Sequence, residues 1–181
     1  AGALYVVRNP LDVLLSLSDH FGISLDQAIA QMADPDARPA PLPPRVPAVM
    51  SSWSNHVRSW TQERNPRLHV MRYEDMLAKP QPTFAKLARF LGLAASRERI
   101  ERAIRFSSFD TLQKLESSKG FVERSSHSER FFRRGKADQW QAVLSADQIG
   151  RIAVVHKAQM ERYGYWPLKP GDRRKFNIAD A

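Results

Sequence analysis

The chain has 181 residues, 43% of them hydrophobic and 26% charged, a composition typical of one soluble globular domain with a substantial core. Its 28 Lys and Arg residues against 19 Asp and Glu give a net charge of +9, which favours anionic partners such as nucleotides, nucleic acid, polyanionic sugars or acidic lipids without choosing among them. The lack of Cys excludes a disulfide scaffold and thiolate chemistry, and no apolar run approaches the ~20 residues that span a bilayer. These features are compatible with the reducing cytoplasm, where we expect the protein to be located.

The first predicted element is a β-strand over 3–7, whose apolar residues suit a strand covered on both faces. A helix over 10–21 follows, with Asn9 as its N-cap. Arg8 therefore lies at the carboxyl end of a strand, where open α/β sheets bind ligands. Ser16 lies seven residues after Asn9, so it returns to the same helix face. A guanidinium and a hydroxyl facing one crevice predict a phosphate site, although a surface ion-pair residue and a solvated serine would give the same pattern.

The next segments are a helix, a loop and another helix. Ser24 and Gln27 form a predicted capping box at the start of the second helix. Residues 34–47 contain six prolines, which predicts a surface loop that either gates a substrate site or only connects two elements. Residues 50–64 have helical periodicity, and the apolar stripe of this helix comprises Trp53, Val57 and Trp60.

A second strand is predicted over 68–72, and Tyr73 leaves its end on the same sheet edge as Arg8. An aromatic ring there could contact a purine, or could simply pack in the core with its hydroxyl bonded. Helices are predicted over 83–91, 97–105 and 109–115, followed by a polar, loop-like segment over 117–130.

The segment 131–136, Phe-Phe-Arg-Arg-Gly-Lys, is a second candidate for anion binding. Two adjacent Arg residues before a Gly can direct guanidinium and backbone N–H groups at one phosphate, since Gly lacks the Cβ that blocks close approach. A basic loop in water is the alternative, but the aromatic pair before the loop and Trp140 after it favour anchoring against a core.

A long amphipathic helix is predicted over 146–163, ended by Gly164. Its inward side is predicted to contain Ile149, Ile152, Ala153, His156 and Met160. The five His residues are dispersed without a metal-binding spacing, so no metal is expected. Because a core strand begins at the second or third residue and only one other strand is evident, we expect the chain to be the back portion of a longer protein.

Five segments, in order, resemble those of the nucleotide-dependent sulfotransferases, which transfer a sulfuryl group from 3′-phosphoadenosine-5′-phosphosulfate (PAPS) to a hydroxyl or amine. They are 5–16, 52–60, 72–76, 107–109 and 132–140. Their order and spacing cover nearly the whole chain. The resemblance implies an α/β fold with a P-loop nucleoside-kinase-like parallel sheet flanked by helices, here mostly helical because further strands would lie upstream.

The resemblance also implies roles for particular residues. Those expected to bind the 3′-phosphate of PAPS are Arg8, Ser16, Arg133, Arg134 and Gly135. Those expected to lie by the adenine are Tyr73 and Phe109. The implied acceptor is a small molecule or a glycan rather than nucleic acid. Asp138 stands where the family often has Gly, which leaves the turn after Lys136 open to a different form.

The family's 5′-phosphosulfate loop and its catalytic His are not in this sequence, so we assign no catalytic residue to this chain, and the chain alone could be inactive. We expect a partial sulfotransferase domain over 1–168 and a basic tail over 169–181. The main alternative is a non-catalytic module that binds polyanions through the basic helix 97–105 and the tail. A third possibility is that the chain by itself binds neither ligand.

Overall fold

The computed structural model describes residues 2–38, 49–168 and 171–172. By their contacts these residues form two compact units. The first comprises the described residues of 1–8, 19–22 and 65–137, and the second those of 9–18, 23–64 and 138–181. Each unit is described by itself below.

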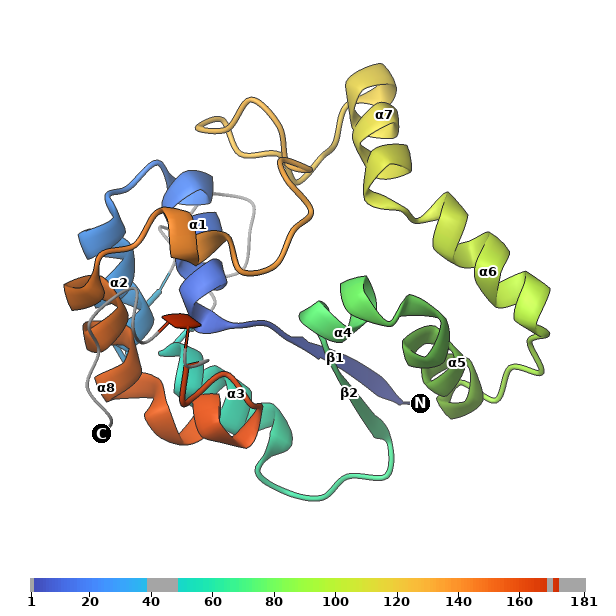
Figure 1. Ribbon diagram of the computed structural model, residues 1–181, viewed down its shortest axis with the longest axis horizontal. Helices are drawn as coiled ribbons and strands as arrows, with labels where there is room; N and C mark the ends of the chain where they lie inside the picture. The colour runs from blue at the N-terminus through green and yellow to red at the C-terminus, as the bar shows by residue number, and fades with distance from the viewer. Residues whose placement is uncertain (1, 39–48, 169–170, 173–181) are drawn as a thin grey trace. The chain divides into compact units, whose positions relative to one another are not determined.

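The first unit contains a parallel pair of strands, β1 (Ala3–Val7) and β2 (Leu68–Arg72), both with the predicted bounds. They lie side by side in Figure 1, and Val7 pairs with Arg72, so both strands end at the same level. This register brings the residues that follow the two strands, Arg8 and Tyr73, to one edge of the sheet.

One expectation about β1 was wrong for the residues that the structure describes. The strand was predicted to be covered on both faces, but Tyr5 and Val7 are buried whereas Leu4 and Val6 are 46% and 42% exposed. Successive side chains of a strand point to opposite faces, so this alternation means that only one face of β1 is packed within the first unit.

Four helices follow β2 in the first unit: α4 (Tyr73–Ala78), α5 (Pro80–Phe90), α6 (Arg97–Phe106) and α7 (Phe109–Lys119). Helix α5 begins three residues before its predicted start, because Pro80 suits the first helical turn. Helix α7 extends beyond its predicted end at Leu115 and stops only at Gly120, whose φ is +73°. The segment predicted as loop-like from Ser117 therefore begins with helix.

The second unit contains most of α1 (Pro10–Phe21), then α2 (Leu25–Ala33), α3 (Trp53–Thr61), the short 3-10 helix η1 (Gln139–Ala142) and α8 (Ala146–Arg162). The predicted caps form: Asn9 Oδ1 accepts the N–H of Leu11 at 3.1 Å, and Ser24 and Gln27 make a reciprocal capping box. Helix α3 is shorter than the predicted 50–64, because Ser52 caps its start and it ends at Thr61.

Helices α2 and α3 pack against α8, as Figure 1 shows. The predicted inward side of α8 is confirmed, since Ile149, Ile152, Ala153, His156 and Met160 are all buried. The predicted stripe of α3 is only partly correct: Val57 is buried, but Trp60 is 46% exposed. His56, on the same helix, is also exposed.

The Pro-rich segment 34–47 lies mostly outside the described residues, as does most of the basic tail. The domain bounds 1–168 and 169–181 thus stay a prediction. Among the described residues, no helix is both long and apolar enough to cross a bilayer.

Candidate nucleotide-binding site

Arg8 and Tyr73 form the first part of the site, at the carboxyl ends of β1 and β2. The Arg8 guanidinium carbon lies 4.5 Å from the centre of the Tyr73 ring, within the range of a cation–π interaction. Both residues are half-buried. Two residues predicted separately, one for a phosphate and one for a purine, are therefore in direct contact.

The Arg-rich loop 131–136 meets this strand end within the first unit. Arg8 Nη2 donates to the carbonyl oxygen of Lys136 at 3.4 Å, a long but directed contact. The guanidinium after the first strand and the predicted anion-binding loop are thus neighbours, although 128 residues separate Arg8 from Lys136 in the sequence. A concentration of cationic and backbone donors of this kind suits a phosphate group.

Gly135 is where the loop packs most closely on α7. Its φ of +58° is in the left-handed region, and a Cβ built there would lie 2.2 Å from Cδ2 of Phe109. Only Gly combines this backbone with this approach. Phe109 therefore forms the floor beneath the loop, so the aromatic residue expected by the adenine and the loop expected at the phosphate lie together.

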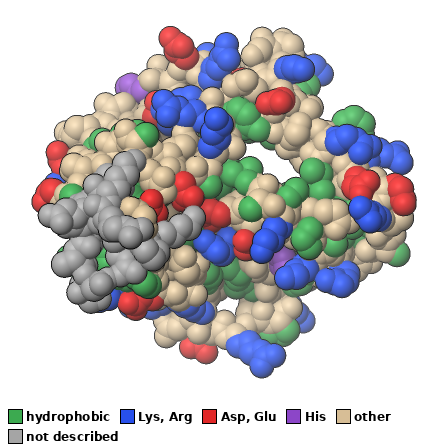
Figure 2. Space-filling model, in the orientation of Figure 1, with side chains coloured by type: hydrophobic (Ala, Val, Ile, Leu, Met, Phe, Trp, Pro, Cys, Tyr) green, Lys and Arg blue, Asp and Glu red, His purple; other side chains and the backbone are tan. Residues whose placement is uncertain are grey.

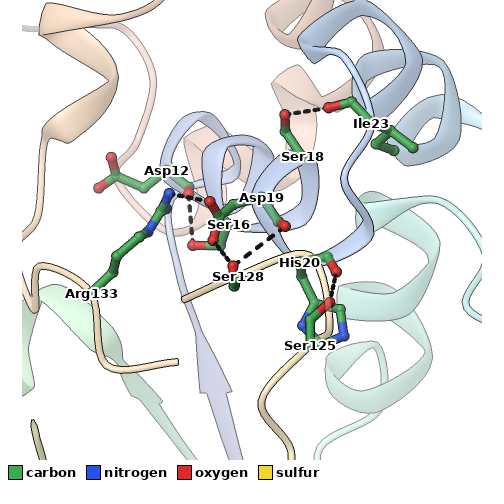
Figure 3. Close-up of polar contacts among 9 residues, drawn as sticks. All are labelled: Asp12, Ser16, Ser18, Asp19, His20, Ile23, Ser125, Ser128 and Arg133. Atoms are coloured by element: carbon green, nitrogen blue, oxygen red, sulfur yellow. Dashed lines mark hydrogen bonds and ion pairs between the residues drawn. The ribbon is translucent and has the colours of Figure 1, made fainter. Parts of the chain in front are cut away.

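Arg133 is held by a carboxylate at the end of α1. Its Nη1 lies 2.6 Å from Oδ1 of Asp19, and the hydroxyl of Ser128 donates to Oδ2 of Asp19 (Figure 3). Ser125 adds a hydrogen bond of 2.5 Å to the carbonyl oxygen of His20. The segment before the Arg-rich loop is thus attached to the last turn of α1. The next residue, Arg134, is exposed to solvent.

Ser16 belongs to the second unit, where its hydroxyl donates to the carbonyl oxygen of Asp12 at 3.4 Å. Asp12 is 1% exposed, and its carboxylate accepts the N–H groups of Asp138 and Trp140 at 2.8 and 3.1 Å. Asp138 has a φ of +59°, so the left-handed turn that a Gly adopts freely is present here in an Asp.

Three residues that organise this region were not predicted from the sequence. Asp19 pairs with Arg133, and Gln113 and Glu116 bind backbone groups of Phe131 and Phe132. The helix was predicted to end at Leu115, so Glu116 was not expected to share a helix face with Phe109 and Gln113. Asp19 carries no motif of its own, and only the fold shows that it pairs with Arg133.

The family model described as "Sulfotransferase domain" matches residues 2–164. The chain belongs to the sulfotransferase family. The recognition made from its five segments is therefore confirmed.

Individual sulfotransferases match over most of this chain. An amine sulfotransferase of Oryctolagus cuniculus is 26% identical over 176 residues, which cover 93% of this chain and 56% of that protein. Cytosolic sulfotransferase 17 of Arabidopsis thaliana is 27% identical over 137 residues, which cover 70% of this chain and 38% of that protein. The chain thus spans only part of the length of these relatives.

Solved structures of sulfotransferases share the fold. Mouse sulfotransferase SULT7A1, crystallised with PAP, superposes with a TM-score of 0.68 at 18% identity, covering 98% of this chain and 63% of that one. Retinol dehydratase, in complex with androsterone and the inactive cofactor PAP, also gives 0.68, at 19% identity, covering 94% of this chain and 50% of that one. The expected P-loop-like α/β fold, mostly helical in this chain, is confirmed.

Proposed function

We propose that this chain supplies the 3′-phosphate and adenine side of a PAPS site, in a sulfotransferase that transfers the sulfuryl group to a hydroxyl or amine of a small-molecule or glycan acceptor. The observation that carries the proposal is the position of the Arg8 guanidinium, which lies over Tyr73 and against the carbonyl of Lys136. The end of β1, an aromatic ring and the Arg-rich loop thereby converge within one unit.

The residues present fit the nucleotide by their chemistry. Arg8, Arg133 and Arg134 offer guanidinium forks that match a phosphate, and Gly135 permits close approach of the backbone. Tyr73 and Phe109 offer π faces to a base. The phosphate contact of Ser16, which belongs to the second unit, stays a prediction from the family resemblance.

PAPS, when bound, would supply the sulfuryl group, and this chain's residues would bind and orient it. A 3′-phosphate would gain charge-assisted contacts with these Arg residues that a nucleotide without this group cannot make, so the site would discriminate in favour of PAPS. The chain therefore contributes affinity and cofactor selectivity, and we assign it no group that moves a proton. We also propose a cytoplasmic location, since relatives such as cytosolic sulfotransferase 17 bear that description.

Calorimetry of the chain with adenosine 3′,5′-bisphosphate and with 5′-AMP tests this assignment. Arg8→Ala and Arg133→Ala should each weaken bisphosphate binding by roughly 10- to 100-fold, the loss of a charge-assisted contact of about 1.5–3 kcal/mol, and change 5′-AMP binding much less. Arg151→Ala is a matched control, because the Arg151 side chain is 43% exposed and pairs with Asp26 at 2.6 Å, as Arg133 is 42% exposed and pairs with Asp19. Equal losses for both nucleotides would refute the assignment.

The polyanion-binding alternative predicts a different result. It requires affinity that grows with polymer length and falls steeply with salt, without stoichiometric bisphosphate binding. On the face shown in Figure 2, Lys and Arg side chains are interspersed with Asp and Glu side chains. Titration with polyanions of increasing length, at two salt concentrations, separates the two functions.

A further inference from the structure

Helix α7 presents one face to the Arg-rich loop. Phe109, Gln113 and Glu116 are spaced four and three residues apart, so they lie on the same side of the helix. All three contact the segment 131–135: Phe109 packs on Gly135, Gln113 Nε2 donates to the carbonyl oxygen of Phe132 at 2.9 Å, and Glu116 binds two consecutive N–H groups.

The hydrogen bonds to the Glu116 carboxylate are the strongest of these contacts. Its Oε1 accepts the N–H of Phe131 at 2.6 Å, and its Oε2 accepts the N–H of Phe132 at 2.9 Å. Hydrogen bonds to an ionised acceptor are shorter and stronger than neutral ones. Gln113 binds the carbonyl of the same Phe132, so both backbone polar groups of the residue that precedes Arg133 are fixed by α7.

The carboxylate is buried, with Glu116 only 7% exposed, yet it stays ionised. Burial raises its pKa, but the two backbone N–H groups and the charges of Arg124 and Arg130 outweigh that effect, and the net pKa is lowered. An aromatic cluster covers the region, with the rings of Phe131 and Phe132 5.2 Å apart. Glu116 thus places a negative charge at the base of a loop that is otherwise strongly cationic.

We propose that Glu116, assisted by Gln113, is a positioning residue that orients Arg133 and Arg134 for the 3′-phosphate contact; this inference rests on the proposed function. Like charges repel, so a loop with four cations among residues 130–136 resists the single compact form that phosphate binding needs. Fixing the backbone just before Arg133 removes that ordering cost from the binding step. Glu116 itself does not touch the nucleotide.

Glu116→Gln is the direct test, because it keeps the size of the side chain but turns one acceptor into a donor that opposes a backbone N–H. We expect about 10-fold weaker bisphosphate binding, with 5′-AMP affinity changed less than about 2-fold. Glu101→Gln is the matched control, since it makes the same substitution on α6, where Glu101 pairs with Arg97 at the surface. Gln113→Leu removes only the weaker contact and should give a smaller loss of the same selectivity, which keeps the test open if Glu116→Gln does not fold.

A second readout does not depend on ligand. Proteolysis generally requires local opening of the backbone, so we expect trypsin to cut Glu116→Gln after Arg133 and Arg134 at least several-fold faster than wild type or Glu101→Gln, with an unchanged circular dichroism spectrum. The positioning role would be overturned if Glu116→Gln is cut no faster than wild type. It would also be overturned if wild type prefers the bisphosphate over 5′-AMP and Glu116→Gln keeps the same preference. If wild type does not distinguish the two nucleotides, the proposed function fails first, and faster cleavage would then reduce Glu116 to a structural residue.

Discussion

Asp19 and Arg133 form an ion pair of 2.6 Å between the end of α1 and the Arg-rich loop (Figure 3). The pair is partly exposed, with the Asp19 side chain at 31% and the Arg133 side chain at 42%, so solvent screens it and its net stabilisation is small. The Asp19 carboxylate binds the same Arg133 guanidinium that we propose binds the 3′-phosphate, so the two anions would compete for it.

Asp19→Asn is therefore expected to tighten bisphosphate binding a few-fold. Arg133 and Ser128 bind different oxygens of Asp19. An Asn can keep its oxygen towards Arg133 and donate its NH₂ to the Ser128 hydroxyl, which can also accept, while the negative charge near the incoming phosphate is removed. Calorimetry at low salt measures the effect. Asp26→Asn is the control, because it neutralises a surface carboxylate that also pairs with an Arg at 2.6 Å, in the second unit. Weaker binding in Asp19→Asn would mean that the charge orients Arg133 instead of competing for it.

Asp12→Asn is expected to lower the free energy of unfolding by about 1–3 kcal/mol, the cost of a mispaired buried polar group. Both Asp12 oxygens accept backbone N–H groups, and an Asn would direct its NH₂ at one of those donors. Chemical denaturation measures the change. Asp147→Asn removes a charge from the first turn of α8, where the side chain is 78% exposed, and should cost only a few tenths of a kcal/mol. Equal costs would mean that the helix dipole, not the buried bonds, explains the role of Asp12.

Gly135→Ala should destabilise the first unit by more than the ~1–2 kcal/mol that a left-handed backbone costs an L-residue, because the new Cβ also meets the Phe109 ring. Gly92→Ala isolates the backbone cost, since Gly92 has a φ of +69° and a Cβ there would have no atom of the described residues within 4 Å beyond its chain neighbours. The difference between the two unfolding free energies then reports the contact with Phe109. No difference would show that the loop moves away from α7 at no cost.

His156 makes stability depend on pH in the second unit. It is fully buried against Trp53 and shares a 2.9 Å hydrogen bond between its Nδ1 and Ser54 Oγ, and burial lowers its pKa to about 4. The unfolded chain, with an ordinary His pKa near ~6.5, binds the proton more readily, so the stabilisation is fully present above about pH 6.5 and is lost as pH falls towards 4.

Thermal melts of wild type and His156→Gln between pH 7 and pH 4 test this dependence. The loss for wild type should be on the order of a few kcal/mol across that range, and the variant should show a shallower slope whatever its stability at pH 7. His20→Gln controls for the loss of one imidazole at the end of α1. A variant slope as steep as that of wild type would assign the pH dependence to other groups.

Local signals in the sequence predicted much of the fold. The predicted caps at Asn9 and Ser24 mark helix starts correctly, because each satisfies backbone N–H groups of the first helical turn. The predicted end of α7 at Leu115 was wrong. The helix continues to Lys119, because no residue before Gly120 breaks a helix.

The candidate site could be predicted only in part. Arg8, Tyr73, Phe109 and Gly135 were found from strand ends and the family resemblance, and the structure brings them together within the first unit. The carboxylates that hold the loop were not found, because a Glu or an Asp on a polar helix face looks the same whether it faces water or a backbone N–H. Their partners lie far along the chain, where spacing carries no information.

The packing of Gly135 on Phe109 has a consequence for how this family member could be altered. A ring of another size would displace the loop, and a side chain at the glycine would tilt the ring. Under the proposed function, a change at either residue would therefore alter both the preference for the base and the preference for the 3′ substituent. A mutant library that aims at a different nucleotide has to vary Phe109 and Gly135 together.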